Sequence, residues 1–371
     1  MIWLTWRQFR AQAVTAVAAL ALFAILLAVT HPQLASLYAT SGFAGCQGGS
    51  CEQLADTFLG QLSNLTPFGG PQAFRLLPAG ANLYVIVYTV GLLFILIAPA
   101  ITGVFWGAPL IAREFETGTG RLTWNQSVTR ARWLTVKLAL TGAAAMAVTE
   151  GFSLLQAWWA APISRAIDLG GSVSVFSGSR FSPLTFAAGG IAPLGYAAFG
   201  FALGVTAGLL IRRAVPAMAL TLAVFAAVQV VMPLWIRPHL LPADQTTAAI
   251  AATHATFSDF SGTSALTATA VPGQPGAWIL SSGPVNAAGQ PVSTLPAACA
   301  QTAGSPVASG GTTASPNSVQ RCLAGHGIRE AVRYQPASHY WPLQLTETAI
   351  FLVLALGLAG FCFWWLDRRQ A

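Results

Sequence analysis

The sequence predicts an all-α membrane protein with six transmembrane helices. Of its 371 residues, 54% are hydrophobic and only 8% are charged, which leaves too little polar surface for a soluble protein of this size. Its apolar stretches are long enough to cross about 30 Å of hydrocarbon. They lack the period-two alternation of barrel strands, so helices are expected. The predicted spans are residues 11–30, 83–108, 136–160, 183–211, 214–235 and 343–366.

The first ten residues, 1–10, are expected to form a short helix in the cytoplasmic interface. Ile2 and Phe9 fall toward one side of a helix, and Arg7 and Arg10 fall toward another. An extension of the first span that carries an aromatic belt is the alternative. The apolar run that follows is longer than the apolar region of a secretory signal and has small residues throughout, so it is assigned as a span.

The other spans are joined by segments of very different length. Residues 31–82 are rich in turn formers and are expected to be an external loop. Pro99 is expected to kink the second span, because proline removes a helical hydrogen bond. The fourth and fifth spans meet in a tight turn at 212–216. An external insertion, 237–342, is rich in Ala, Thr, Ser, Gly and Pro, so its middle is expected to be flexible. The last span and its tail occupy 343–371.

Basic residues near the span ends predict the orientation of the chain. The short loops on one side hold only Arg75, Arg165 and Arg180. Because positive charge accumulates on the cytoplasmic side, both termini are expected there. This topology accounts for the net charge of +7, and no basic groove with interleaved aromatics indicates nucleic-acid binding. The cytoplasmic basic residues are Arg7, Arg10, Arg113, Arg121, Arg130, Arg132, Lys137, Arg212, Arg213, Arg368 and Arg369.

The five cysteines fit this topology. Cys46 and Cys51 share the first external loop, and Cys299 and Cys322 share the large insertion, where disulfides persist. The local pairs 46 with 51 and 299 with 322 are the economical assignment. Cys362 lies inside the last span and is expected to be a small buried hydrophobic residue. No cysteine or histidine spacing indicates a metal site.

The loop at 109–133, within the segment 11–236 that holds the first five spans, is the main candidate site. Gly118 and Gly120 are expected to end the helix that leaves the second span, and Thr129 to cap the helix that enters the third. The residues between can form a short helix along the membrane surface. Their charges and aromatic rings favour a cytoplasmic partner, and a solvated connector is the alternative.

This loop resembles that of permease subunits of ATP-binding-cassette exporters of the type-2 superfamily. An acidic pair, a Gly-Thr step, a leucine, a turn hydrophobe with an arginine, and a lysine on the next span recur there. Ser127 stands where the family often has proline. The matching residues of this chain are Glu114, Glu116, Gly118, Thr119, Leu122, Val128, Arg130 and Lys137.

The rest of the chain is similar to that family in topology. The arginine-rich loop, which also contains Arg121, and the single lysine among 18 basic residues resemble permeases of high-GC Gram-positive bacteria. The resemblance implies a multi-pass protein of the bacterial plasma membrane. It also implies that the loop docks in a cleft of a separate ATPase subunit, and that two permease copies pair with two ATPases.

The resemblance further implies export of an amphipathic or lipid-like compound. No Gly-x-x-x-x-Gly-Lys-[Ser/Thr] segment occurs in the sequence, so ATP and magnesium are expected on the ATPase partner and no cofactor on this chain. The direction of transport follows from the resemblance alone. Whether the two permeases are identical, and whether substrate enters from the cytosol or the inner leaflet, stays open.

Polar residues within the spans are the candidates for a translocation path. A carboxylate at bilayer depth is costly unless it is neutral, paired or facing water, so Glu150 is assigned to the path or to the dimer contact. A hydrogen-bonded structural carboxyl is the alternative. Gln156, Gln229 and Phe225 are further candidates for lining the path. Glu347 lies near the outer end of the last span, where helix capping or snorkelling is expected.

Gly200, Gly204 and Gly208 repeat a G-x-x-x-G spacing in the fourth span. This spacing forms a smooth helix face that another helix can approach closely. Packing within the chain is favoured over a dimer contact.

Two other classes of function remain. A membrane-anchored sensor or assembly protein, whose insertion binds a ligand or partner, is the alternative to a transporter. A passive channel would need a ring of pore charges that the sequence lacks. The histidines lie outside the spans and no nucleophile is paired with a base, so the chain is not expected to be an enzyme.

Overall fold

The computed structural model describes residues 2–46, 51–64, 82–116, 129–169, 179–250, 256–260, 263–268, 271–292, 299 and 316–369. The chain forms two compact units. The first is helical and comprises Met1–Ile167, Gly171–Arg237 and Trp341–Ala371. The second comprises Asp168–Gly170 and Pro238–Tyr340.

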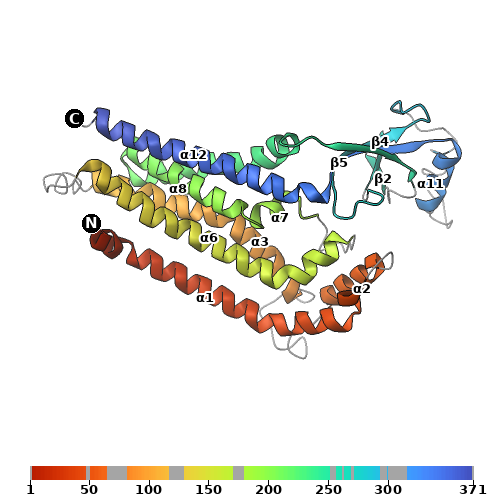
Figure 1. Ribbon diagram of the computed structural model, residues 1–371, viewed down its shortest axis with the longest axis horizontal. Coiled ribbons are helices and arrows are strands. Elements are labelled where there is room, and N and C mark those ends of the chain that lie inside the picture. The colour runs from red at the N-terminus through yellow and green to blue at the C-terminus, as the bar shows by residue number, and fades with distance from the viewer. Residues whose placement is uncertain are drawn as a thin grey trace. The chain divides into compact units, whose positions relative to one another are not determined.

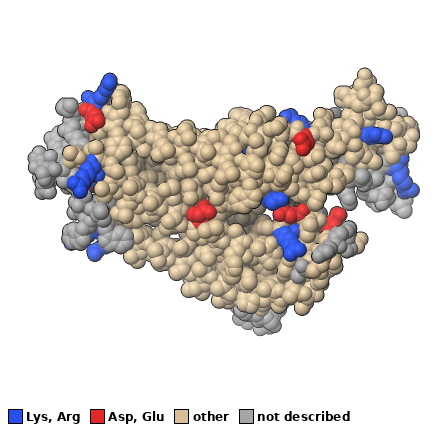
Figure 2. All heavy atoms as spheres, in the orientation of Figure 1, with Lys and Arg blue, Asp and Glu red and all other residues tan. Residues whose placement is uncertain are grey.

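Among the described residues, six helical segments are long and apolar enough to cross a membrane, as the sequence predicts. Figure 1 shows α1 beginning and α12 ending at the same end of the helical unit. On the face drawn in Figure 2, charged side chains lie at that end and again around the middle and right of the picture, and much of the surface between these groups is uncharged. The segments are α1 (Ile2–Thr40), α3 with α4 (Leu83–Thr102 and Ala108–Glu116), α6 (Arg130–Asp168), α8 (Ala192–Ile211), α9 (Ala214–Val231) and α12 (Tyr340–Arg369).

Two of these helices exceed their predicted spans by far. Helices α1 and α6 each contain 39 residues, which corresponds to about 58 Å, well above the thickness of the hydrocarbon core. The expectation of a loop from residue 31 is wrong, because α1 continues through Pro32 to Thr40. Pro32 removes one helical hydrogen bond, and Leu34, two residues later, is fully buried. Residues 2–10 are continuous with α1, and their place in the membrane interface stays a prediction.

The extended end of α1 packs against a short helix, α2 (Cys51–Asn64), and is hydrogen-bonded to the extended end of α6. The guanidinium of Arg165 on α6 donates a hydrogen bond to the hydroxyl of Tyr38 on α1 at 2.7 Å. Tyr38 packs edge-on against Phe43 in the 3-10 turn η1 (Phe43–Gly45) and against Phe58 of α2. The disulfide between Cys46 and the first residue of α2 closes this aromatic cluster.

The predicted fourth span is a broken helix rather than one continuous rod. Helix α7 (Pro183–Ala188) ends at Gly189, and α8 begins at Ala192. Gly190 between them has a φ of +62°, a left-handed conformation that glycine adopts without steric cost. The sequence pattern missed the break because the segment is apolar throughout.

Two π-turns interrupt the other spans next to prolines. The first, η3 (Gly103–Gly107), separates α3 from α4 and follows Pro99 closely. The second, η4 (Met232–Ile236), contains Pro233 and extends α9 into the 3-10 turn η5 (Arg237–His239). Proline removes a helical donor, and π-turns accommodate one extra residue at such places.

The second unit contains β-strands, so the all-α expectation is wrong for the insertion. A three-stranded antiparallel sheet has the order β1-β5-β4, and β2 and β3 form a separate antiparallel pair. Glu330, Val332 and Tyr334 alternate inward along β5, and Val332 packs with Val271 in a small core. The elements are β1 (Asp244–Ala248), β2 (Thr256–Phe260), β3 (Thr263–Thr267), β4 (Trp278–Val285), α11 (Pro316–Gly325), β5 (Arg329–Gln335) and the 3-10 turn η7 (Ala337–His339).

Candidate functional site

The two ends of the 109–133 loop are described, and its middle is not. Helix α4 carries Glu114 and Glu116 in its last turn, and α6 begins at Arg130. Thr129 caps α6 as predicted, because its hydroxyl accepts a hydrogen bond from the backbone N–H of Arg132 at 3.3 Å. The predicted coupling residues that lie outside the described residues are Gly118, Thr119, Arg121, Leu122 and Val128, together with the side chain of Arg130.

Glu114 forms an ion pair with Lys137 of α6. The side chains are 17% and 4% exposed, so the pair is largely removed from solvent. The ammonium group of Lys137 also lies 4.6 Å from the ring centre of Trp133, one helical turn earlier. Breaking a buried pair by removing one partner leaves an uncompensated charge, which costs about 3–5 kcal/mol. This contact therefore joins the end of α4 firmly to the start of α6.

Glu116 connects the end of α4 to the N-terminus of α9. Its Oε1 accepts a hydrogen bond from the backbone N–H of Ala214, the first residue of α9, at 2.9 Å. A carboxylate at a helix N-terminus is also favoured by the helix dipole. The preceding turn contains Arg212, whose guanidinium lies 5.5 Å from the ring centre of Phe115. The acidic pair thus connects the loop to α6 on one side and to the α8–α9 turn on the other.

The three glycines of α8 pack within the chain, against the second span. A Cβ on Gly200 would lie 2.8 Å from the carbonyl oxygen of Pro99. A Cβ on Gly204 would overlap the carbonyl oxygen of Gly103, and one on Gly208 would overlap that of Ala108. Helix α8 therefore lies directly on the backbone of α3, η3 and α4, so a movement of α4 must also move α8 or separate the two.

Side chains from α6 and α12 satisfy the backbone groups at the break between α7 and α8. Gln344 of α12 accepts a hydrogen bond from Ala192 N at 2.9 Å and donates one to Phe186 O at 3.0 Å. Ser153 of α6 donates to Ala188 O at 2.8 Å. Each of these backbone groups would otherwise be a polar atom left unsatisfied in an apolar bundle. Glu150 of α6 lies near the backbone N–H of Leu194, and its Oε2 is buried without a hydrogen-bond partner among the described residues.

A buried ion pair lies one turn further along α12 than Gln344. Arg237 donates two hydrogen bonds to the carboxylate of Glu347, at 2.8 and 3.0 Å, and both side chains are completely buried. The hydroxyl of Tyr196 donates to the same carboxylate. The guanidinium carbon of Arg237 lies 3.9 Å from the ring centre of Phe186. The expectation of capping or snorkelling for Glu347 is wrong, because this carboxylate faces an arginine inside the bundle.

The remaining path candidates contact different neighbours. Gln156 is 2% exposed and donates to Tyr88 O at 3.4 Å, and Gln229 donates to Leu96 O at 3.5 Å. Phe225 is buried against the ring of Tyr196. Sequence reasoning missed Arg237, Tyr196 and Gln344 as partners. The available signal was a lone arginine at the end of the fifth span, which the sequence placed at the start of the insertion.

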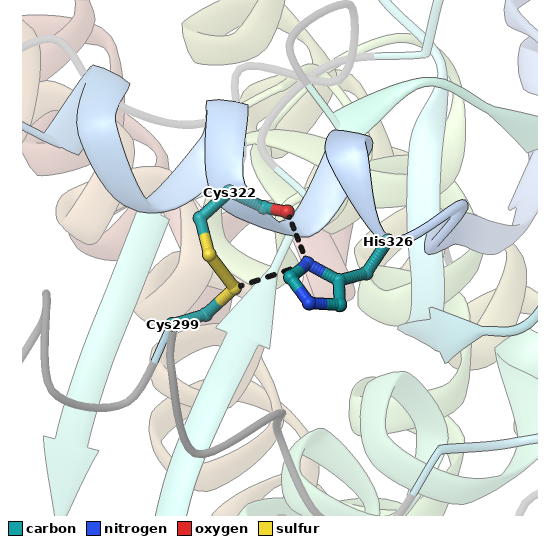
Figure 3. Close-up of side chains that lie close together, drawn as sticks. All are labelled: Cys299, Cys322 and His326. Carbon is teal, nitrogen blue, oxygen red and sulfur yellow. Dashed lines mark hydrogen bonds between the residues drawn. A yellow bond between two sulfur atoms is a disulfide. The ribbon is translucent and has the colours of Figure 1, made fainter.

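Both predicted disulfides are present in the structure. Cys46 pairs with Cys51, and Cys299 pairs with Cys322. Figure 3 shows the ring of His326 beside the second disulfide, with Nδ1 2.9 Å from the carbonyl oxygen of Cys322. The two sulfurs and the imidazole lie within 4.8 Å of one another, a spacing that fits a metal ion. Because both sulfurs are held in the disulfide, they are not thiolate ligands here.

The described features define a multi-pass membrane protein whose polar loop ends are connected to several spans, as in a transporter permease. A family model described as "ABC-2 membrane transporter related" matches residues 17–237, more than half of the chain. The chain therefore belongs to that family, which implies an ATP-binding-cassette transporter with an ATPase partner. No curated protein and no solved structure matches the chain.

Proposed function

We propose that this chain is the membrane-spanning permease subunit of an exporter whose separate ATPase subunits supply the energy. Two permease copies, identical or closely related, assemble with two ATPases in the bacterial plasma membrane. The complex moves an amphipathic or lipid-like compound outward. In this proposal the 109–133 loop is the coupling element, both termini are cytoplasmic, and residues 237–342 are extracellular.

The connections made by the acidic pair support this proposal. Glu114 holds α6 through Lys137, and Glu116 holds the N-terminus of α9 at Ala214. A force applied to residues 117–128 by a closing ATPase would thus reach three membrane-spanning segments directly. Alternating access requires two packed arrangements of the helices that ATP binding favours differently.

Co-purification and ATP hydrolysis test the coupling assignment. We expect the double variant Glu114→Ala with Arg130→Ala to lose both ATPase association and substrate-stimulated hydrolysis. The matched control is Glu52→Ala with Arg329→Ala, which removes one acidic and one basic residue from segments that are external in this proposal. Intact association and stimulation in the first variant would contradict the coupling role.

Labelling tests the orientation. A membrane-impermeant maleimide should label Thr119→Cys only after the cells are permeabilised, and should label Ser281→Cys of β4 in intact cells. Ser281 is an exposed position, and the native cysteines are either disulfide-bonded or buried. Labelling of position 119 in intact cells would rule out contact with a cytoplasmic ATPase.

One observation favours the sensor alternative. The second unit has its own sheet, core and disulfide, as expected of a module that binds a ligand or partner. In that case the insertion would bind its ligand without any stimulation of ATP hydrolysis or movement of substrate. Reconstituted transport therefore separates the two functions.

A further inference from the structure

The disulfide between Cys299 and Cys322 in the second unit is asymmetric, because its two cysteines differ in exposure. Cys299 is completely buried, whereas Cys322 is partly exposed. His326, whose ring lies beside the bond, is exposed. A nucleophile from solvent therefore reaches the side of the bond that Cys322 contributes.

The imidazole of His326 faces the buried sulfur. His326 follows Cys322 by four residues, so the two side chains lie on the same side of the end of α11. Its Nδ1 lies 2.9 Å from the carbonyl oxygen of Cys322 and 3.8 Å from Sγ of Cys299 (Figure 3). A carbonyl oxygen only accepts hydrogen bonds, so Nδ1 carries the proton. The same N–H is in place to donate to Cys299 when that sulfur becomes a thiolate.

The end of α11 disfavours negative charge on the other sulfur. Cys322 lies in the last turn of α11, which ends at Gly325. The C-terminus of a helix carries partial negative charge, so a thiolate is less stable at Cys322 than beside the N–H of His326. In thiol–disulfide exchange, the sulfur that forms the more stable thiolate leaves faster. Exposure, the helix end and the imidazole thus all favour attack at Cys322 and departure of Cys299.

We propose that Cys322 is a modification site for low-molecular-weight thiols, with Cys299 as the leaving group and His326 as the donor that stabilises it. The thiolate of such a compound attacks Sγ of Cys322 and forms a mixed disulfide there. The bond between the two cysteines breaks, and its electron pair leaves on Sγ of Cys299, which accepts the hydrogen bond from His326. A second thiolate then attacks the sulfur of the bound compound, which yields the oxidised dimer of the compound and a Cys322 thiolate that takes a proton from water.

The exchange has a consequence for the second unit. The disulfide closes a segment of 23 residues. Such a link restricts the unfolded chain, so its opening lowers the stability of the unit that contains it. The second unit thereby responds to the thiols in its surroundings. This inference is independent of transport and is tested on the permease alone.

The position of the first adduct tests the direction of attack. Full-length protein in detergent is treated with excess glutathione, blocked with N-ethylmaleimide at early times and digested with trypsin. Cleavage after Arg321 places the two cysteines on different peptides, so mass spectrometry identifies which one carries glutathione. We expect the adduct on Cys322 to exceed that on Cys299 at least about tenfold, the combined effect of one hydrogen bond and a helix end. Equal adducts, or an excess on Cys299, would overturn the proposal.

His326→Ala tests the imidazole. It should slow adduct formation at Cys322 about threefold to tenfold, the effect of one lost hydrogen bond to the leaving sulfur. His239→Ala is the matched control, because it removes another exposed histidine of the same unit, outside the group of Cys299, Cys322 and His326. An unchanged rate in His326→Ala, or equal slowing in both variants, would overturn the role of His326.

The other disulfide is the reference within each sample. The bond between Cys46 and Cys51 lies in the helical unit, so glutathione should open it at the same rate in all three proteins. Slowing of that reaction to the same extent in His326→Ala would assign the effect to the protein as a whole and refute the local contact. If His326→Ala does not fold, the position of the adduct in the unaltered protein still decides between the two sulfurs.

Discussion

Arg237 shows how single residues acquire their roles in this protein. Its position in the sequence places it at the start of an external insertion, where water would solvate the guanidinium and no ion-pair partner is needed. In the structure it is fully buried and paired with Glu347. The second π-turn explains the change of environment. In an unbroken α-helix Arg237 would point about 120° away from buried Phe225, and the extra residue of η4 turns it back by about 100°.

The buried pair predicts a clear pattern of stability. Arg237→Met should destabilise the protein by about 3–5 kcal/mol, because it leaves the carboxylate of Glu347 buried without its cation. The double variant Arg237→Met with Glu347→Leu should recover most of that loss, since an apolar pair of similar volume is well tolerated. Thermal unfolding in detergent measures both.

Arg333→Met is the matched control for this experiment. Arg333 is exposed on β5, so its replacement should change the free energy of unfolding by less than about 0.5 kcal/mol. A double variant no more stable than Arg237→Met alone would show that the charge pair is not the source of the effect.

At the scale of elements, α8 packs directly against the backbone of the second span. The spacing of Gly200, Gly204 and Gly208 predicted a helix face that permits close approach, and the structure places α3, η3 and α4 on that face. Sequence could not identify the partner, because every span offers apolar surface. The partner is set by Gly103 and Gly107, which present glycine backbone to α8 in return.

Substitution of these glycines tests the contact. Gly204→Ala should lower the yield of folded protein severely, because the new Cβ would overlap the backbone of Gly103 and no flexible side chain can move aside. Gly360→Ala in α12 is the control, since nothing lies within 4 Å of the added atom. It should be neutral or stabilise the helix by up to about 1 kcal/mol. Size-exclusion profiles compare the two, and equal profiles would argue against the close contact.

The insertion shows the limit of composition as a guide. Its Ala, Thr, Ser, Gly and Pro content predicts a flexible middle, yet β4 within that middle pairs with β5. Pairing between strands far apart in sequence carries no local signature, and β5 lies more than 40 residues after β4. The predicted disulfide between Cys299 and Cys322 was a sign of order in the insertion, and Tyr334 of β5 is part of the small core.

At the scale of the whole molecule, the two disulfides differ in what they constrain. The bond from Cys299 to Cys322 closes a segment of 23 residues and that from Cys46 to Cys51 one of 5. Loop-closure entropy therefore predicts about 3 kcal/mol for the first and about 2 kcal/mol for the second. We expect the pair of Cys299→Ala and Cys322→Ala to expose the second unit to proteolysis.

The double variant Cys46→Ala with Cys51→Ala is the comparison for this experiment. It should leave the second unit as resistant to protease as it is in the unaltered protein, because those cysteines lie in the helical unit. If the second unit resists the protease in both variants, its sheet stays folded without the disulfide.

By itself, the sequence predicted a multi-pass membrane protein, the six helices that are apolar enough to cross a bilayer, and the pairing of the cysteines. These properties depend on local hydrophobicity, on backbone hydrogen bonds made within each helix, and on neighbours in sequence. Only the tertiary structure decided that Glu347 meets Arg237, that the fourth span is broken at Gly190, and that the acidic pair holds α6 and α9. Those outcomes depend on the rotation and register of helices distant in sequence, which π-turns and breaks shift by whole residues.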